Sequence, residues 1–153
     1  MNRIPKAANK WWVFWPIFLT YVGLWAMPGE MWFKTRSLNI GNAVAGDAPI
    51  VVEDREIRWS FKGRYSTETR DAKTNDIAGG CQGSGDVSYK GGLSGPKTYN
   101  LVDHTDGKTA CRFLTPGAYY TEVCRTILRP LYGILPAKSS CATSNIFTVE
   151  APK

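Results

Sequence analysis

The sequence contains a single histidine, His104, and no CxxC pair among its four cysteines. Zinc sites of ordinary spacing need closely spaced cysteine and histidine ligands, which this sequence does not supply. It also has no EF-hand loop, and the glycine-rich segment 79–85 lacks the lysine and the following helix of a P-loop. We therefore expect no cofactor and no metal.

A basic surface is also missing from most of the chain. The formal net charge is +6, but residues 37–153 contain 14 basic and 12 acidic residues, a net charge of only +2. This part has no basic stripe with interleaved aromatic residues of the kind that binds nucleic acid. The sequence therefore does not predict a nucleic acid as partner.

Charge is wholly absent from the 17 residues between Trp11 and Met27. As a helix this run is about 26 Å long, and residues 11–33 reach about 34 Å, which brackets a hydrocarbon core of about 30 Å. We predict a transmembrane anchor over residues 11–33, with membrane lipid as its partner. Tryptophan side chains near both ends are typical of membrane interfaces: they are Trp11, Trp12, Trp15, Trp25 and Trp32.

A basic leader precedes this run, with Arg3, Lys6 and Lys10 among residues 1–10. Because positive flanks stay on the cytoplasmic side, we expect a cytoplasmic N-terminus and an exported C-terminal part. A cleaved secretory signal is the alternative, since it also has a basic leader and an apolar stretch. The run is longer than the usual stretch of about 7–15 residues, which favours an uncleaved anchor.

All four cysteines follow the apolar run, at Cys81, Cys111, Cys124 and Cys141. An even number of cysteines in a small exported domain predicts two disulfides. Three connectivities remain open. We favour pairing of neighbours, Cys81 with Cys111 and Cys124 with Cys141, because the second pair flanks a predicted hairpin.

Residues 37–48 are mostly small and nearly uncharged, as in a flexible segment, and we predict a tether over residues 34–48. Residues 49–153 contain no internal repeat and no amphipathic helical pattern. Between residues 57 and 62 large apolar side chains alternate with polar ones, and residues 118–128 and 145–150 are also typical of strands. Six to eight short strands are expected in about 100 residues, which predicts one all-β antiparallel sandwich of the immunoglobulin-like class.

Two segments near the C-terminus support this class by resemblance. LTPGAYYTEVC, residues 114–124, and SNIFTV, residues 144–149, resemble the last two strands of bacterial immunoglobulin-like domains. The anchor, the tether, DREIRWSFKGRY and a Gly-Cys-x-Gly-x-Gly segment are together similar to small single-pass membrane proteins of proteobacteria and their phages. The resemblance implies a bacterial inner-membrane protein with its domain in the periplasm.

Candidate catalytic groups are few. His104 lies beside Asp103 and close to Asp106, but a Ser-His-Asp arrangement cannot be inferred from local sequence, and a solvated turn is the simpler interpretation. The acidic residues of segment 53–56 alternate with arginine, which favours a charged edge strand over a calcium site. We therefore predict no catalytic residue.

The segment RPLYGILPAK, residues 129–138, is apolar and bounded by prolines at Pro130 and Pro136. An apolar loop at the end of a rigid sandwich suits the docking of a partner. The predicted contact residues are Leu131, Tyr132, Ile134 and Leu135. The alternative is that the loop folds back over the open end of its own sandwich.

These features lead to one functional hypothesis and its competitors. We expect a non-enzymatic protein-interaction module that is anchored in the inner membrane and binds a periplasmic protein, as a bacterial or phage envelope accessory. An enzyme is the competing class, either a hydrolase that uses His104 or a thiol oxidant that uses a cysteine pair. A lysis or pore-forming membrane factor is a third possibility.

Overall fold

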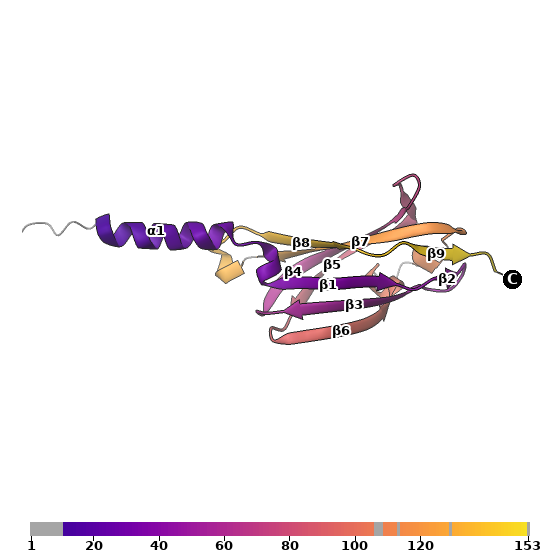
Figure 1. Ribbon diagram of the computed structural model, residues 1–153, viewed down its shortest axis with the longest axis horizontal. Coiled ribbons are helices and arrows are strands. Elements are labelled where there is room, and N and C mark those ends of the chain that lie inside the picture. The colour runs from indigo at the N-terminus through magenta and orange to yellow at the C-terminus, as the bar shows by residue number, and fades with distance from the viewer. Residues whose placement is uncertain (1–10, 106–108, 113, 129, 153) are drawn as a thin grey trace, which may run out of the picture.

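The computed structural model describes residues 11–105, 109–112, 114–128 and 130–152. The molecule is elongated, with helix α1 (Trp11–Ala26) projecting from one end of a body of strands, while the chain ends at the opposite end (Figure 1). A short 3₁₀ helix, η1 (Gly29–Met31), joins the helix to the strands.

Helix α1 has 16 residues and is shorter than the sequence predicted. The predicted helical span ran to residue 33, but the helix ends at Ala26. Proline disfavours helical backbone in the residue before it, so Pro28 accounts for this end. Trp32 and Phe33 instead lie buried in the body of the protein. Within the described residues, the chain forms no helix with both the length and the apolar character needed to cross a membrane.

Three strands form the smaller sheet in the order β1-β3-β6, and both of its pairings are antiparallel. Their bounds are β1 Phe33–Ile40, β3 Ile50–Ile57 and β6 Leu93–Asn100. The larger sheet has six strands, in the order β2-β9-β7-β4-β5, with β8 also paired to β7. Their bounds are β2 Ala43–Val44, β4 Phe61–Asp71, β5 Ile77–Tyr89, β7 Gly117–Leu128, β8 Lys138–Thr143 and β9 Phe147–Glu150.

The two sheets confirm an all-β sandwich as the architecture. Strand β7 lies at the centre of the larger sheet, paired with β4 on one edge and with both β8 and β9 on the other. Its residues alternate regularly between buried and partly exposed, which is the period of two that its sequence predicted. Three further short 3₁₀ helices connect the strands: η2 (Leu101–His104), η3 (Thr109–Arg112) and η4 (Pro130–Gly133).

The predicted tether over residues 34–48 is wrong. Most of its first half belongs to β1, which pairs with β3 from Phe33↔Ile57 to Ile40↔Val51. Leu38 and Ile40 are two residues apart and are both buried in the main core. This alternation gives the segment one apolar face, and the face is buried against the larger sheet. The folded body therefore begins at about residue 33 and is joined closely to α1.

Three groups of buried side chains hold the sandwich together. The main core lies between the sheets toward the end opposite α1, and it includes Cys81, Cys111, Tyr119, Val123 and Phe147. A second cluster closes the end next to α1, and a third combines Phe33, Ile57 and Tyr89.

Candidate functional site

A buried ion pair joins the two sheets. The Arg125 guanidinium, on β7, lies 2.7 Å from the Glu53 carboxylate, on β3, and their side chains are 1% and 0% exposed. Glu53 follows the inward parity of β3, and β3 is the central strand of its sheet. The prediction that segment 53–56 forms a charged edge strand is therefore wrong, because strands β1 and β6 cover both edges of β3.

Neighbouring polar side chains complete the hydrogen bonding of this pair. Arg125 Nε donates to the Tyr89 hydroxyl at 3.0 Å. Glu53 accepts hydrogen bonds from Thr35 at 3.2 Å and from the Tyr99 hydroxyl at 3.4 Å. A desolvated ion pair is tolerated when its remaining donors and acceptors are satisfied in this way. The arrangement links the two sheets through one buried polar network.

This pair was not predicted from the sequence, although the sequence contains one signal of it. Arg125 falls between Val123 and Ile127 on the inward face of β7. All the remaining residues on that face are uncharged. A lone charge on an otherwise apolar strand face indicates a buried partner, because an unpaired charge is too costly to bury.

His104 lies at the end of η2, beside the ion pair. Its imidazole is 4.2 Å from the Tyr99 ring and 5.0 Å from the Tyr65 ring, measured between centroids. Burial, reinforced by the nearby charge of Arg125, lowers the pKa of His104 to about 4, so the imidazole is neutral near pH 7.

The surroundings of His104 do not resemble a catalytic triad. A triad needs an acid that accepts a hydrogen bond from Nδ1 of the imidazole. In the described part of the chain, Nδ1 of His104 is buried and has no hydrogen-bond partner. The adjacent Asp103 instead accepts a hydrogen bond from the backbone N–H of Asn100 at 3.1 Å, and so caps η2. Asp106 lies outside the described residues.

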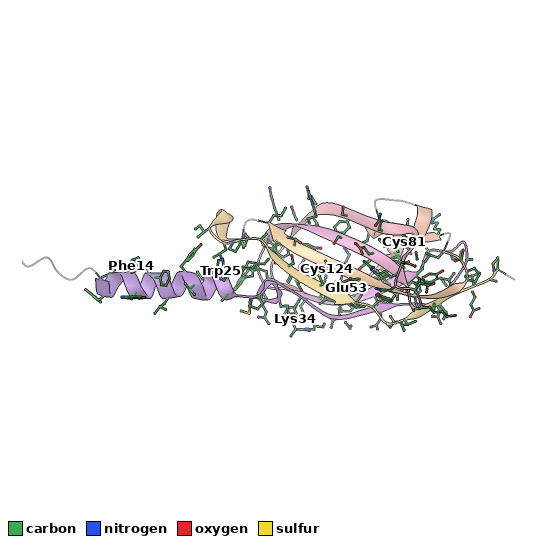
Figure 2. All side chains as sticks on the ribbon, turned by 90° about the horizontal axis from the view of Figure 1, so that it is seen from above. Phe14, Trp25, Lys34, Glu53, Cys81 and Cys124 are labelled. Atoms are coloured by element: carbon green, nitrogen blue, oxygen red, sulfur yellow. A yellow bond between two sulfur atoms is a disulfide. The ribbon has the colours of Figure 1, made fainter. Side chains whose placement is uncertain are left out.

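The described side chains of helix α1 are mostly apolar on all sides, and all except the partly buried Leu24 face solvent. Ile17 is 66% exposed and Leu19 is 62% exposed, and these two side chains are about 200° apart around the helix axis. Trp12, Trp15 and Trp25 are also exposed. Figure 2 shows Phe14 and Trp25 along the helix, well away from Glu53 and Cys124 in the sandwich. The side chain of Trp11 lies outside the described residues.

The end of α1 is joined to the sandwich by a small apolar cluster. Buried Trp32, Ile127 and Leu135 form this junction cluster, and Leu24 packs against it from the helix. The Lys138 ammonium, on β8, donates a hydrogen bond to the backbone carbonyl of Trp25 and lies 5.8 Å from that tryptophan's ring.

Two of the four predicted partner-binding residues can be placed. Leu135 is 3% exposed within the junction cluster, so it contacts its own chain, as the alternative interpretation of this loop predicted. Ile134 is 65% exposed and faces away from the cluster. The side chains of Leu131 and Tyr132 lie outside the described residues.

Both predicted disulfides are present, as Cys81–Cys111 and Cys124–Cys141. The first pair is fully buried and ties β5 to η3, while the second joins β7 to β8. Glu122, Cys124 and Cys141 place potential metal-ligand atoms within 4.8 Å of one another. Because the two sulfur atoms are bonded to each other, neither offers a thiolate to a metal in this state.

An open hollow lies at the end of the sandwich opposite α1, with a volume of about 780 Å³. It is lined by residues 41–44 and 46–48, with Ile50, Asn100, Arg112 and Glu150. Its charged groups, Asp47, Arg112 and Glu150, are mixed in sign. The glycine-rich segment 79–85, which superficially resembled a phosphate loop, lies within strand β5.

No known protein-family model matches this chain, and no curated protein sequence matches it. The class of protein defined by the fold is a small disulfide-bonded β-sandwich with an apolar N-terminal helix.

Proposed function

We propose that this chain is a non-enzymatic, membrane-anchored module that presents an immunoglobulin-like domain to a partner protein. The observation that carries the proposal is the continuous apolar surface of α1, which packs against the sandwich only at its last turns. A helix that is hydrophobic all round belongs in an apolar environment, and lipid is the environment that suits an isolated one.

The length of α1 bears on how it sits in a bilayer. Its 16 residues correspond to about 24 Å, somewhat less than a hydrocarbon core of about 30 Å. Bilayers adapt to short helices by local thinning, and flanking side chains reach out to the interface. The position of Lys138 beside Trp25 supports an interface at this end of the helix, because both side chains favour the headgroup region.

The strand order supports the immunoglobulin-like assignment. The smaller sheet, β1-β3-β6, corresponds to strands A, B and E, and the path β9-β7-β4-β5 corresponds to G, F, C and C′. Tyr119 at the start of β7 donates a hydrogen bond to the Thr115 carbonyl at 2.7 Å, like the tyrosine corner at the start of strand F. In this reading Glu53 and Arg125 link strands B and F, which a disulfide joins in antibody domains.

Two features favour export of the domain. Disulfides form and persist in oxidising compartments, and both cysteine pairs are oxidised. The leader before α1 carries Arg3, Lys6 and Lys10, which favours a cytoplasmic N-terminus. We therefore place the helix in a bacterial inner membrane and the sandwich in the periplasm.

Membrane attachment can be tested with matched charge substitutions. Ile17→Arg combined with Leu19→Arg places charge on two sides of α1, and each arginine costs about 2.5–3.5 kcal/mol at the centre of a membrane helix. The double variant should move from the membrane pellet to the soluble fraction after carbonate extraction. Ile146→Arg combined with Ile77→Arg is the control, since these residues are exposed on the sandwich at 65% and 40%. Equal release of both variants would contradict an anchor at α1.

The partner protein can be identified by crosslinking from position 134. A photo-crosslinking amino acid in place of Ile134 should capture a protein in native membranes, whereas the same group in place of Ile146 should not. The two side chains are equally exposed, at 65%, and Ile134 belongs to the predicted docking segment. Crosslinks to lipid alone, or the same products from both positions, would contradict this docking surface.

A further inference from the structure

The two disulfides differ sharply in how far solvent reaches them. Cys81 and Cys111 are both 0% exposed, in the core between the sheets. Cys141 is exposed and Cys124 is half-buried, on the outer face of the larger sheet. Figure 2 shows Cys81 toward the far end of the molecule and Cys124 nearer its middle. Only the second bond is open to a reagent in water while the sandwich stays folded.

Strand pairing explains why the second bond is at the surface. Cys124 and Cys141 are direct partners in the antiparallel pairing of β7 with β8. Residues Val123 and Arg125 on either side of Cys124 point into the core, so its own side chain must point outward. The larger sheet continues through β4 and β9 without this bond. Its cleavage therefore does not require the sheets to separate.

We propose that Cys124–Cys141 is a thiol-exchange site whose reaction partner is a dithiol, whereas Cys81–Cys111 is inert in the folded protein. Exposed disulfides are generally the labile ones, because exchange begins with attack of a thiolate on an accessible sulfur. This inference does not depend on membrane attachment or on a protein partner.

The geometry assigns a role to each sulfur. A thiolate of the dithiol attacks Sγ of exposed Cys141 and forms a mixed disulfide. The Cys124–Cys141 bond breaks, and its electron pair leaves with Sγ of Cys124, which takes a proton from water. The second thiolate of the reagent then attacks the reagent's own sulfur in the mixed disulfide and releases Cys141 as a thiolate, which takes the second proton from water. The protein gains two electrons and two protons, and the dithiol becomes a cyclic disulfide.

A neighbouring carboxylate controls the departure of the leaving sulfur. Glu122 lies on the same outer face of β7, with Oε1 at 3.9 Å from Sγ of Cys124. Its negative charge disfavours a thiolate at Cys124, and a less stable leaving thiolate slows exchange. Glu122→Gln removes this charge with little change of shape, and should accelerate reduction about three- to tenfold.

The test is differential alkylation of the full-length chain in detergent micelles. The oxidised protein is treated with dithiothreitol for increasing times, free thiols are blocked, and each cysteine is quantified by mass spectrometry. Cys124 and Cys141 should become labelled at least tenfold faster than Cys81 and Cys111. Equal rates, or faster labelling of the buried pair, would overturn the proposal.

A second variant serves as a control for the loss of charge in Glu122→Gln. Asp86 is an exposed carboxylate on β5, two strands from β7 in the same sheet, and Asp86→Asn should leave the rate unchanged. Faster reduction in Glu122→Gln alone supports an effect of the Glu122 charge on exchange at this bond. An unchanged rate in Glu122→Gln, or the same acceleration in both variants, would overturn that effect.

Discussion

Glu53 and Arg125 are the most deeply buried charged side chains in the described part of the sandwich. Removing one member leaves the other buried without its counter-charge, which typically costs about 3–5 kcal/mol. We expect Arg125→Met to lower the free energy of unfolding by this amount, measured by urea denaturation of the oxidised protein. The double variant Glu53→Leu/Arg125→Met should recover most of the loss, because apolar replacement of both charges is often neutral. A single variant as stable as the parent would contradict the buried ion pair.

His104 makes stability depend on pH. Burial and the nearby guanidinium of Arg125 lower its pKa from 6.5 to about 4, so the unfolded chain binds a proton at a higher pH than the folded one. The folded state is therefore favoured above pH 6.5, and this contribution is lost as the pH falls from about 6.5 to about 4. The loss is at most about 3 kcal/mol.

The contribution of His104 can be separated from that of the carboxylates. Hydrogen bonds lower the pKa values of Glu56 and Asp71, so these groups also favour the folded state less in acid. The stabilisation from these two carboxylates is lost at a lower pH than that from His104, because their pKa values in the unfolded chain are 4.5 and 3.8. His104→Gln should flatten urea-unfolding stability between pH 7 and pH 5 while the decline below pH 4.5 persists. An identical profile for parent and variant would contradict a buried, neutral His104.

At the scale of elements, η1 and β8 approach each other closely at one glycine. A Cβ added at Gly29 would lie 2.6 Å from the backbone oxygen of Ser139, a contact that neither backbone can relieve without moving. Gly29→Ala should destabilise the protein by about 1–3 kcal/mol, since overpacking forces backbone shifts. Gly41→Ala is the control, because its added Cβ would meet nothing closer than 3.8 Å. Thermal melting of both variants by circular dichroism tests the expectation.

Strands with a regular alternation of apolar and polar residues were predictable, and strand β1, which has few apolar residues, was not. Residues 117–128 show a clean period of two, and the strand followed from it, while the favoured pairing of Cys124 with Cys141 followed from the predicted hairpin. The sequence predicts a tether in place of β1, because only Leu38 and Ile40 mark its buried face near the middle of residues 34–48. Long-range pairing with β3 decides its structure, and no local pattern reveals that contact.

Sites formed between distant strands were hidden for the same reason. Glu53 and Arg125 are 72 residues apart, and neither local sequence shows that their side chains meet between two sheets. The role of residues 129–138 could be predicted only in part. An apolar loop next to an apolar helix end can either bind a partner or pack against its own chain. Leu135 packs against its own chain and Ile134 is exposed, and the turn between η4 and β8 sets this division.

At the scale of the whole molecule, the helix adds little to the core of the sandwich. The buried apolar residues of the described chain all lie at or after Trp32, and α1 contributes only the partly buried Leu24 to the junction cluster. We therefore expect the stability of the sandwich to depend little on the helix, although the two are closely joined in the chain. A membrane anchor and its domain should behave in this way. Deletion of residues 1–26 should leave a soluble sandwich with both disulfides intact.

This truncation also tests how the two parts depend on each other. Loss of the Leu24 contact and of the Lys138 hydrogen bond to Trp25 should reduce stability by about 1–2 kcal/mol, because both groups are partly exposed in the full chain. The truncated protein should therefore still show a cooperative thermal transition by circular dichroism and should remain in the supernatant after ultracentrifugation. A fragment without such a transition would mean that α1 completes the core, and its exposed apolar surface would then need an explanation other than lipid.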